Sequence, residues 1–198
     1  MTKRIKKEEL QVLIEEIEKG NVVSFPTDTV YGIACKMEEA AVQKMKWVKG
    51  RDEKKPFPTM VSSLKQICDI AEVTPLAEKI IENFMPGAMT LVLRKKEVIP
   101  DLATNGQPTI AIRMPDDETV LNILKETGPL LVTSANLSGM PAGHTTEEVM
   151  EQLEGRISCI LEGTSGGSLA STIVDCTGSE IKVLREGPIT LEMMMEKL

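Results

Sequence analysis

Hydrophobic and polar positions alternate along this chain in short segments, and their spacing changes repeatedly between helical and strand-like. Between residues 8 and 19, apolar side chains recur at intervals of three and four, which predicts a helix that ends at Gly20. Thr145 and Glu148 form a capping-box signal that begins another helix. The predicted helices cover residues 8–19, 37–48, 64–71, 76–84, 145–153 and the segment from 190 onward. The run Met193–Met195 is expected to be a packing surface of the last helix.

Short apolar runs bounded by turn-forming residues predict the strands. They cover residues 22–25, 31–35, 57–61, 89–93, 109–114, 130–133, 158–161, 171–176 and 181–184. Because helices and strands are interspersed throughout, the pattern predicts a mixed α/β fold with a central twisted sheet. The sequence contains no repeat, linker or low-complexity tract, so we expect a single domain over residues 1–198.

Composition and charge exclude several classes of protein. Hydrophobic residues make up 41% of the chain and charged residues 27%, which excludes a disordered chain. A net charge of -7 and an aromatic content of 3% disfavour a general nucleic-acid coat protein. Four widely spaced cysteines and one histidine offer no zinc-site spacing, and they favour free thiols in a reducing compartment. The charged N-terminus and the lack of any apolar run of about 20 residues predict a cytoplasmic protein with no membrane segment.

Familiar catalytic motifs are also excluded. Residues 163–167 match the pattern G-x-S-x-G of a hydrolase nucleophile. That mechanism needs a histidine base after the serine, whereas His144 precedes it. No phosphate-binding P-loop, H-E-x-x-H zinc motif or G-x-G-x-x-G motif is found.

Three polar loops next to predicted strands carry the candidate chemistry. Residues 26–32 offer two hydroxyls, a carboxylate and a phenol directly after a buried strand, where open α/β sheets bind ligands. Residues 49–55 contain four cations that would clamp phosphates or form a solvated cluster at a helix end. Residues 133–139 carry small hydroxyl and amide groups that would hold an anion or stabilise a turn. Both interpretations of each loop remain open at this point.

Arg113 strengthens the binding interpretation. It ends an apolar strand, and an arginine buried there needs an anionic partner. Together, the three loops and Arg113 describe a pocket for a polyanion beside a small zwitterion.

Six motifs occur along the chain in the order found in the YrdC/TsaC family, and the resemblance covers essentially the whole chain. They are P-T-D-T-V-Y-G, K-G-R, T-I-A-I-R, T-S-A-N-L-S-G, S-T-I-V-D and L-R-E-G. The most specific pairing is K-x-R followed by S-x-N. The resemblance implies a single-domain, YrdC-like twisted mixed sheet, flanked by helices, with a concave positively charged cleft. Since the sequence ends at Leu198, it resembles the short form without a C-terminal extension.

The family resemblance implies an L-threonylcarbamoyladenylate synthase, which is a nucleotidyltransferase. Its substrates would be L-threonine, bicarbonate and ATP, and its products threonylcarbamoyl-AMP, for tRNA modification, and pyrophosphate. Mg²⁺ would enter with ATP, with no metal site on the protein. Further partners would be tRNA and downstream threonylcarbamoyl-transfer proteins. The alternatives are a YciO-like paralogue and an RNA-binding YrdC module without synthase activity, and the oligomeric state is left open.

The same resemblance implies roles for individual residues. The catalytic residues would be Lys49 and Arg51. The L-threonine site would comprise Thr29, Arg113, Ser134 and Ser171. The ATP site would comprise Arg51, Lys55, Thr109, Asn136, His144 and Arg185. Some relatives have a histidine where this chain has Met60, which leaves selectivity for threonine open.

Overall fold

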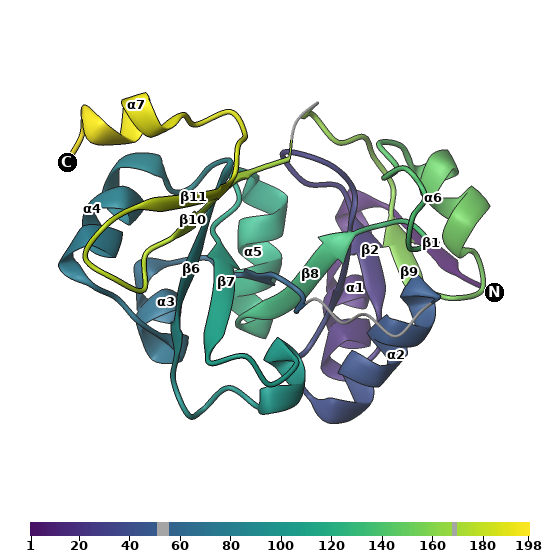
Figure 1. Ribbon diagram of the computed structural model, residues 1–198. Coiled ribbons are helices and arrows are strands. Elements are labelled where there is room, and N and C mark those ends of the chain that lie inside the picture. The colour runs from purple at the N-terminus through teal and green to yellow at the C-terminus, as the bar shows by residue number, and fades with distance from the viewer. Residues whose placement is uncertain (51–55, 168–169) are drawn as a thin grey trace.

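The computed structural model describes residues 1–50, 56–167 and 170–198. Within these residues one mixed sheet has helices packed on both of its faces (Figure 1). The strand order is β1-β9-β2-β3-β8-β4-β7-β6-β10-β11, and β5 pairs with β6 outside this path. The fold is therefore the mixed α/β sheet predicted from the sequence.

The helices and strands have the following bounds. The α-helices are α1 (Leu10–Glu18), α2 (Glu39–Lys49), α3 (Leu64–Ile70), α4 (Pro75–Phe84), α5 (Glu118–Thr127), α6 (Thr146–Leu153) and α7 (Leu191–Met195). The short 3-10 helices are η1 (Lys7–Glu9) and η2 (Asp101–Thr104). The strands are β1 (Lys3–Ile5), β2 (Val23–Phe25), β3 (Gly32–Cys35), β4 (Thr59–Met60), β5 (Ala71–Glu72), β6 (Met89–Lys95), β7 (Thr109–Arg113), β8 (Leu130–Ser134), β9 (Cys159–Leu161), β10 (Thr172–Asp175) and β11 (Lys182–Arg185).

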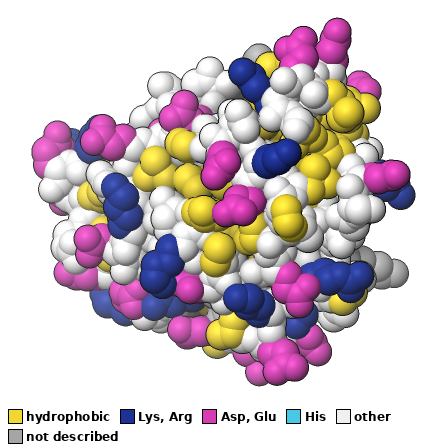
Figure 2. Space-filling model, turned by 90° about the vertical axis from the view of Figure 1, so that its left-hand side faces the viewer, with side chains coloured by type: hydrophobic (Ala, Val, Ile, Leu, Met, Phe, Trp, Pro, Cys, Tyr) yellow, Lys and Arg dark blue, Asp and Glu magenta, His cyan; other side chains and the backbone are white. Residues whose placement is uncertain are grey.

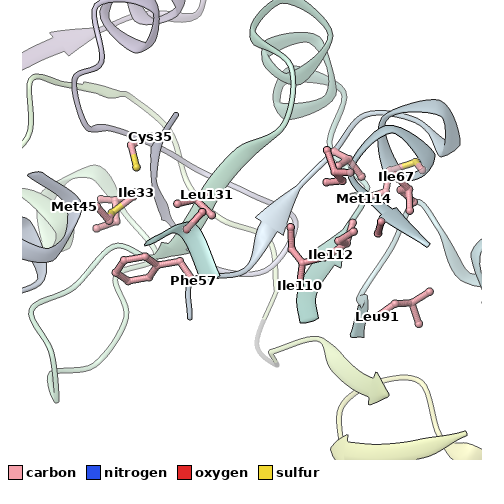
Figure 3. Close-up of a cluster of buried hydrophobic side chains, with 14 of the residues drawn as sticks. Ile33, Cys35, Met45, Phe57, Ile67, Leu91, Ile110, Ile112, Met114 and Leu131 are labelled. Carbon is pink, nitrogen blue, oxygen red and sulfur yellow. The ribbon is translucent and has the colours of Figure 1, made fainter. Parts of the chain in front are cut away.

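Alternation along the strands divides the core between the two faces of the sheet. Leu131 of β8 belongs to the larger hydrophobic cluster, whereas its neighbours Leu130 and Val132 belong to the smaller one. The larger cluster runs along the sheet from Ile33 to Leu91 (Figure 3). The smaller cluster lies under α1 and α5 and includes residues of β1, β2, β8 and β9. On the same face, next to these helices, a cavity lies over the neighbouring strands β4, β6 and β7.

Helix α5 and strand β1 are among the elements that were not predicted. Helix α5 has the N-cap Asp117 and the C-cap Gly128, and the spacing of its buried Val120, Ile123 and Leu124 is helical, so the signal was present and was missed. Strand β1 is three residues long and pairs in parallel with β9, more than 150 residues away, which no local pattern encodes. The predicted strand over 57–61 is shorter than expected, because only β4 pairs regularly.

The C-terminal side of the molecule, on the left of Figure 1, carries α7 and β11. Figure 2 shows hydrophobic side chains gathered on this side among charged residues of both signs. Leu184, Leu191 and Met195 are exposed, and of the run Met193–Met195 only Met194 is buried. The expectation that this whole run packs was therefore wrong for two of its three residues. In the part of the chain described here, none of the helices has the length and apolarity to cross a membrane.

Candidate functional site

A cavity of about 330 Å³ lies on the face of the sheet that α5 and α1 cover only in part. Its wall is formed by the loop at residues 26–32 and by side chains of β4, β6, β7, β8, β10 and β11. Segments far apart in the sequence therefore meet here. Met60 and Val132 extend the smaller hydrophobic cluster into the cavity and give it one apolar side.

Strand register builds the floor of the cavity. Arg185 of β11 pairs with Ile173 of β10, which pairs with Thr90 of β6. The antiparallel register of β6 and β7 brings Thr90 opposite Arg113, and Arg113 pairs with Met60 of β4. Paired residues on neighbouring strands share a face and lie about 5 Å apart. The register alone therefore places two arginines in one row, with Ile173 and Thr90 between them.

Arg113 is buried and held by three contacts. Its Nη2 lies 2.7 Å from Oδ2 of Asp28, its Nη1 donates to Oγ1 of Thr29 at 2.9 Å, and its Nε donates to the carbonyl oxygen of Gly87 at 3.1 Å. Burial lowers the pKa of the guanidinium, and Asp28 opposes that shift. The anionic partner expected for a buried Arg113 is thus supplied by the chain itself. Within the described residues, two of the five N–H groups are left for a ligand.

Arg185 approaches the same cavity from the edge strand. Its Nε and Nη2 donate to the carbonyl oxygen of Ser171 at 3.1 and 2.8 Å, and Nη2 also donates to the Ser171 hydroxyl at 3.2 Å. Burial, followed by the nearby charge of Arg113, lowers the pKa of Arg185. No carboxylate pairs with Arg185 in the described part of the chain. Two guanidinium groups therefore line the cavity, and among the described residues a carboxylate pairs with only one of them, so the cavity favours an anion.

The loop at residues 26–32 is fixed from both sides. Asp28 accepts from the backbone N–H of Asp116 at 3.1 Å, and the N–H of Gly167 donates to the carbonyl oxygen of Thr29 at 3.1 Å. The phenol of Tyr31, which the sequence offered as a ligand group, is fully buried and within 3.0 Å of the Thr146 hydroxyl and the Leu161 carbonyl oxygen. The Tyr31 hydroxyl is therefore occupied by hydrogen bonds within the protein, and the threonines supply the polar groups of this loop.

The second and third loops meet through Lys49. Its Nζ donates to the carbonyl oxygen of Ser134 at 2.9 Å and to Oδ1 of Asn136 at 3.2 Å. The Asn136 amide nitrogen donates to the carbonyl oxygens of Leu137 and Met140 at 2.8 and 2.7 Å. Both side chains are buried, and neither is part of the cavity wall. As the structure shows them, Lys49 and Asn136 connect the end of α2 to the loop after β8.

The structure brings only some of the predicted site residues together. Those that line the cavity are Thr29, Arg113, Ser134, Ser171 and Arg185. Thr109 begins β7, four residues and about 13 Å along the strand from Arg113. His144 precedes α6, where its backbone N–H donates to Glu148 at 2.6 Å, and it does not line the cavity. Arg51 and Lys55 lie outside the described residues.

Sequence reasoning did not select Thr27, Asp28 or Thr90 as individual site residues. Thr90 had a signal, because alternation along the strand places it on the face opposite Met89 and Leu91. Asp28 belonged to a recognised motif, but its pairing with Arg113 spans 85 residues. Within the described ranges, His, Cys, Asp and Glu side chains form no group of three or more that would hold a metal ion.

Comparisons with known proteins show the family and the fold of this chain. The Sua5/YciO/YrdC family model, described as "Telomere recombination", matches residues 15–187. A curated relative from Pyrococcus abyssi, named threonylcarbamoyl-AMP synthase, is 35% identical over 96% of this chain, which spans only 57% of that relative's length. The crystal structure of P. abyssi Sua5 complexed with L-threonine superposes with a TM-score of 0.92 at 32% identity, covering 100% of this chain and 61% of that one. The crystal structure of E. coli YciO superposes with a TM-score of 0.88 at 25% identity, covering 98% and 100% of the two chains.

Proposed function

Because the chain belongs to the Sua5/YciO/YrdC family, we propose that it is a threonylcarbamoyl-AMP synthase. The proposed substrates are L-threonine, bicarbonate and ATP, and the proposed products are threonylcarbamoyl-AMP and pyrophosphate. The observation that carries this proposal is the cavity in which Arg113 lies among the hydroxyls of Thr29, Ser134 and Ser171. A guanidinium among hydroxyls suits the carboxylate and the polar groups of a small hydroxylated amino acid.

The proposed chemistry needs no nucleophile from the protein. The amine of L-threonine adds to CO₂ derived from bicarbonate and loses a proton, which gives a carbamate. An oxygen of the carbamate attacks the α-phosphorus of ATP, the bond to the bridging oxygen breaks, and pyrophosphate leaves. The protein contributes by positioning the reactants and by placing cationic groups near the developing charge.

Arg113 is assigned to the carboxylate of the amino acid, because two of its N–H groups remain for a ligand after Asp28, Thr29 and Gly87 are satisfied. Arg185 is assigned to the nucleotide side, since it lies at the edge of the cavity and has no acidic partner among the described residues. We propose that Mg²⁺ is part of the ATP substrate, as is usual where phosphate oxygens supply most of its ligands. The phosphate-binding roles proposed for Lys49, Arg51 and Lys55 remain predictions.

The direct test is incubation of the protein with ATP, L-threonine, bicarbonate and Mg²⁺. We expect threonylcarbamoyl-AMP by mass spectrometry and an equal amount of pyrophosphate, with neither formed when threonine is omitted. Because the superposition with YciO covers that whole chain, a YciO-like protein without synthase activity is the second candidate. The absence of any threonine-dependent product would favour that candidate.

Substitution of Arg113 tests the assignment of the cavity. Arg113→Lys keeps a positive charge beside the buried Asp28 but loses the planar fork of N–H groups. We expect the KM for L-threonine to rise at least about tenfold and the KM for ATP to change less than about threefold. The matched control is Arg94→Lys, at an exposed position on β6, which should leave the KM for L-threonine and the KM for ATP unchanged. A larger effect on ATP than on threonine would remove Arg113 from the amino-acid site.

A further inference from the structure

The loop at residues 26–30 contains two threonine hydroxyls whose protons can be assigned from geometry. Oγ1 of Thr27 lies 2.7 Å from the carbonyl oxygen of Val30, and a carbonyl oxygen can only accept. A hydroxyl carries a single proton, so the proton of Thr27 is used in this bond. The backbone N–H of Thr29 also donates to Oγ1 of Thr27, at 3.2 Å.

The polarity of the Thr29 hydroxyl follows from that of Thr27. The two Oγ1 atoms are 3.1 Å apart, and because Thr27 has no proton left, Thr29 is the donor in this pair. Oγ1 of Thr29 also accepts from Nη1 of Arg113 at 2.9 Å. A hydroxyl oxygen has two lone pairs, so Thr29 keeps one lone pair and no proton for a ligand. Thr29 lines the cavity and is only 6% exposed.

From this proton count we propose that Thr27 is a positioning residue that fixes the Thr29 hydroxyl as an acceptor, so that Thr29 recognises the amino nitrogen of the amino-acid substrate. The inference rests on the proposed function. A carboxylate has no proton to give, so it cannot be the partner of Thr29. The neighbouring N–H groups of Arg113 supply the donors that a carboxylate needs.

The position of Asp28 favours the amine over the side-chain hydroxyl of the substrate. The α-amine and the carboxylate are attached to the same carbon atom, so a carboxylate held by Arg113 brings the amine next to Thr29. The Asp28 carboxylate, 2.7 Å from Arg113, offsets the positive charge of that guanidinium and so reduces its repulsion of an ammonium group beside Thr29. After the proposed carbamate forms, its nitrogen keeps a single N–H, which matches the single lone pair of Thr29.

Two further hydroxyls that line the cavity, those of Thr90 and Ser171, have the complementary polarity. Oγ1 of Thr90 and Oγ of Ser171 are 2.7 Å apart, and Ser171 accepts from Arg185. One of the two hydroxyl protons is used between them, and the other remains for a ligand. The Thr90 and Ser171 pair therefore offers a hydroxyl donor, whereas the Thr29 hydroxyl offers only an acceptor, and this difference favours one orientation of an amino acid in the cavity.

The test compares two ligands by titration calorimetry: L-threonine and (R)-3-hydroxybutyrate, which lacks only the amino group. We expect the wild type to bind L-threonine at least about tenfold more tightly. In Thr29→Val, threonine affinity should fall at least about tenfold and 3-hydroxybutyrate affinity less than about threefold. The ratio of the threonine affinity to the 3-hydroxybutyrate affinity should therefore approach one. Thr27→Val should lower the ratio in the same direction, whereas Thr29→Ser and Thr27→Ser should keep it, because each retains a hydroxyl.

The ratio of two affinities within one variant separates recognition from a structural defect, since a distorted cavity would weaken both ligands. Equal losses for the two ligands in Thr29→Val would overturn the inference and leave the proposed function standing. A ratio that falls in Thr29→Val but not in Thr27→Val would overturn the positioning role of Thr27. No threonine binding by the wild type, together with no threonine-dependent pyrophosphate, would overturn both proposals.

Discussion

At the scale of single residues, the cavity depends on a place where two backbone segments touch. A Cβ atom added to Gly167 would lie 2.6 Å from the carbonyl oxygen of Asp28 and 2.7 Å from Cα of Thr29. Both neighbours are backbone atoms, so they cannot turn aside as a flexible side chain would. The absence of a side chain at Gly167 thus lets this segment pack against the loop that carries Thr29.

We expect Gly167→Ala to displace that loop. Overpacking of this kind costs about 1–3 kcal/mol, and the displacement of Thr29 should raise the KM for L-threonine at least about fivefold. The matched control is Gly166→Ala, where a Cβ would meet nothing within 4 Å. Thermal unfolding and threonine titration of both variants provide the measurement. Equal behaviour of the two alanine variants would show that the contact does not hold the loop.

The buried ion pair of Arg113 and Asp28 shows a second effect at this scale. Removing one member of such a pair leaves the other as an uncompensated buried charge, which typically costs 3–5 kcal/mol. For this reason a lysine at position 113 separates recognition from stability better than an alanine does. Among the residues that the structure describes, the buried Oδ1 of Asp28 has no hydrogen-bond partner, which adds to the dependence of this carboxylate on Arg113.

At the scale of elements, α6 shows how local signals position a helix beside the cavity. Oγ1 of Thr145 accepts from the N–H of Glu148 at 3.2 Å, and the Glu148 carboxylate accepts from the N–H of Thr145 at 3.3 Å. The capping box predicted from the sequence is therefore confirmed. The first residue of the helix, Thr146, hydrogen-bonds to the hydroxyl of Tyr31, so the start of α6 also supports the loop at residues 26–32.

We expect Thr145→Ala to lower the free energy of unfolding by about 1 kcal/mol, which corresponds to a decrease of about 2–4 °C in Tm. Glu151→Ala, at an exposed position of the same helix, is the control and should leave Tm unchanged within about 1 °C. Differential scanning calorimetry of the two variants measures the effect. A decrease of similar size in both would show that the cap makes no specific contribution to stability.

At the scale of the whole molecule, burial controls the chemistry of the cysteines. Burial raises the pKa of Cys35 and Cys159 to about 12 and that of Cys176 to about 11. At pH 8 the thiolate fraction of these groups is therefore on the order of one in a thousand or less. Cys68 is exposed on α3.

A thiol-reactive dye at pH 8 should therefore modify Cys68 rapidly and the three buried cysteines only after unfolding. We expect one fast-reacting thiol in the native protein and four in denaturant, because the sequence has 4 cysteines. Cys68→Ser should abolish the fast phase. Rapid labelling of a second thiol in the native protein would show that the sheet opens far more easily than its packing indicates.

Several features of this molecule were determined by the sequence alone. Helical spacing placed α1, α4 and α6 within one or two residues of their observed bounds, and apolar runs located most strands, because both signals act between near neighbours in the chain. The position of Arg113 at the end of β7 followed in the same way, whereas its burial did not. The order of six motifs was sufficient to indicate the family.

The tertiary structure decided which of these residues meet. Whether Arg113 faces Asp28 or a solvent-exposed surface depends on a strand order and register that bring residues 85 positions apart into contact, and no local spacing encodes that register. The same applies to the row from Arg185 to Met60, and to the position of Thr109 away from the cavity. The proton polarity of Thr29 required the actual distances to Thr27 and Arg113, because a hydroxyl donates or accepts according to its partners.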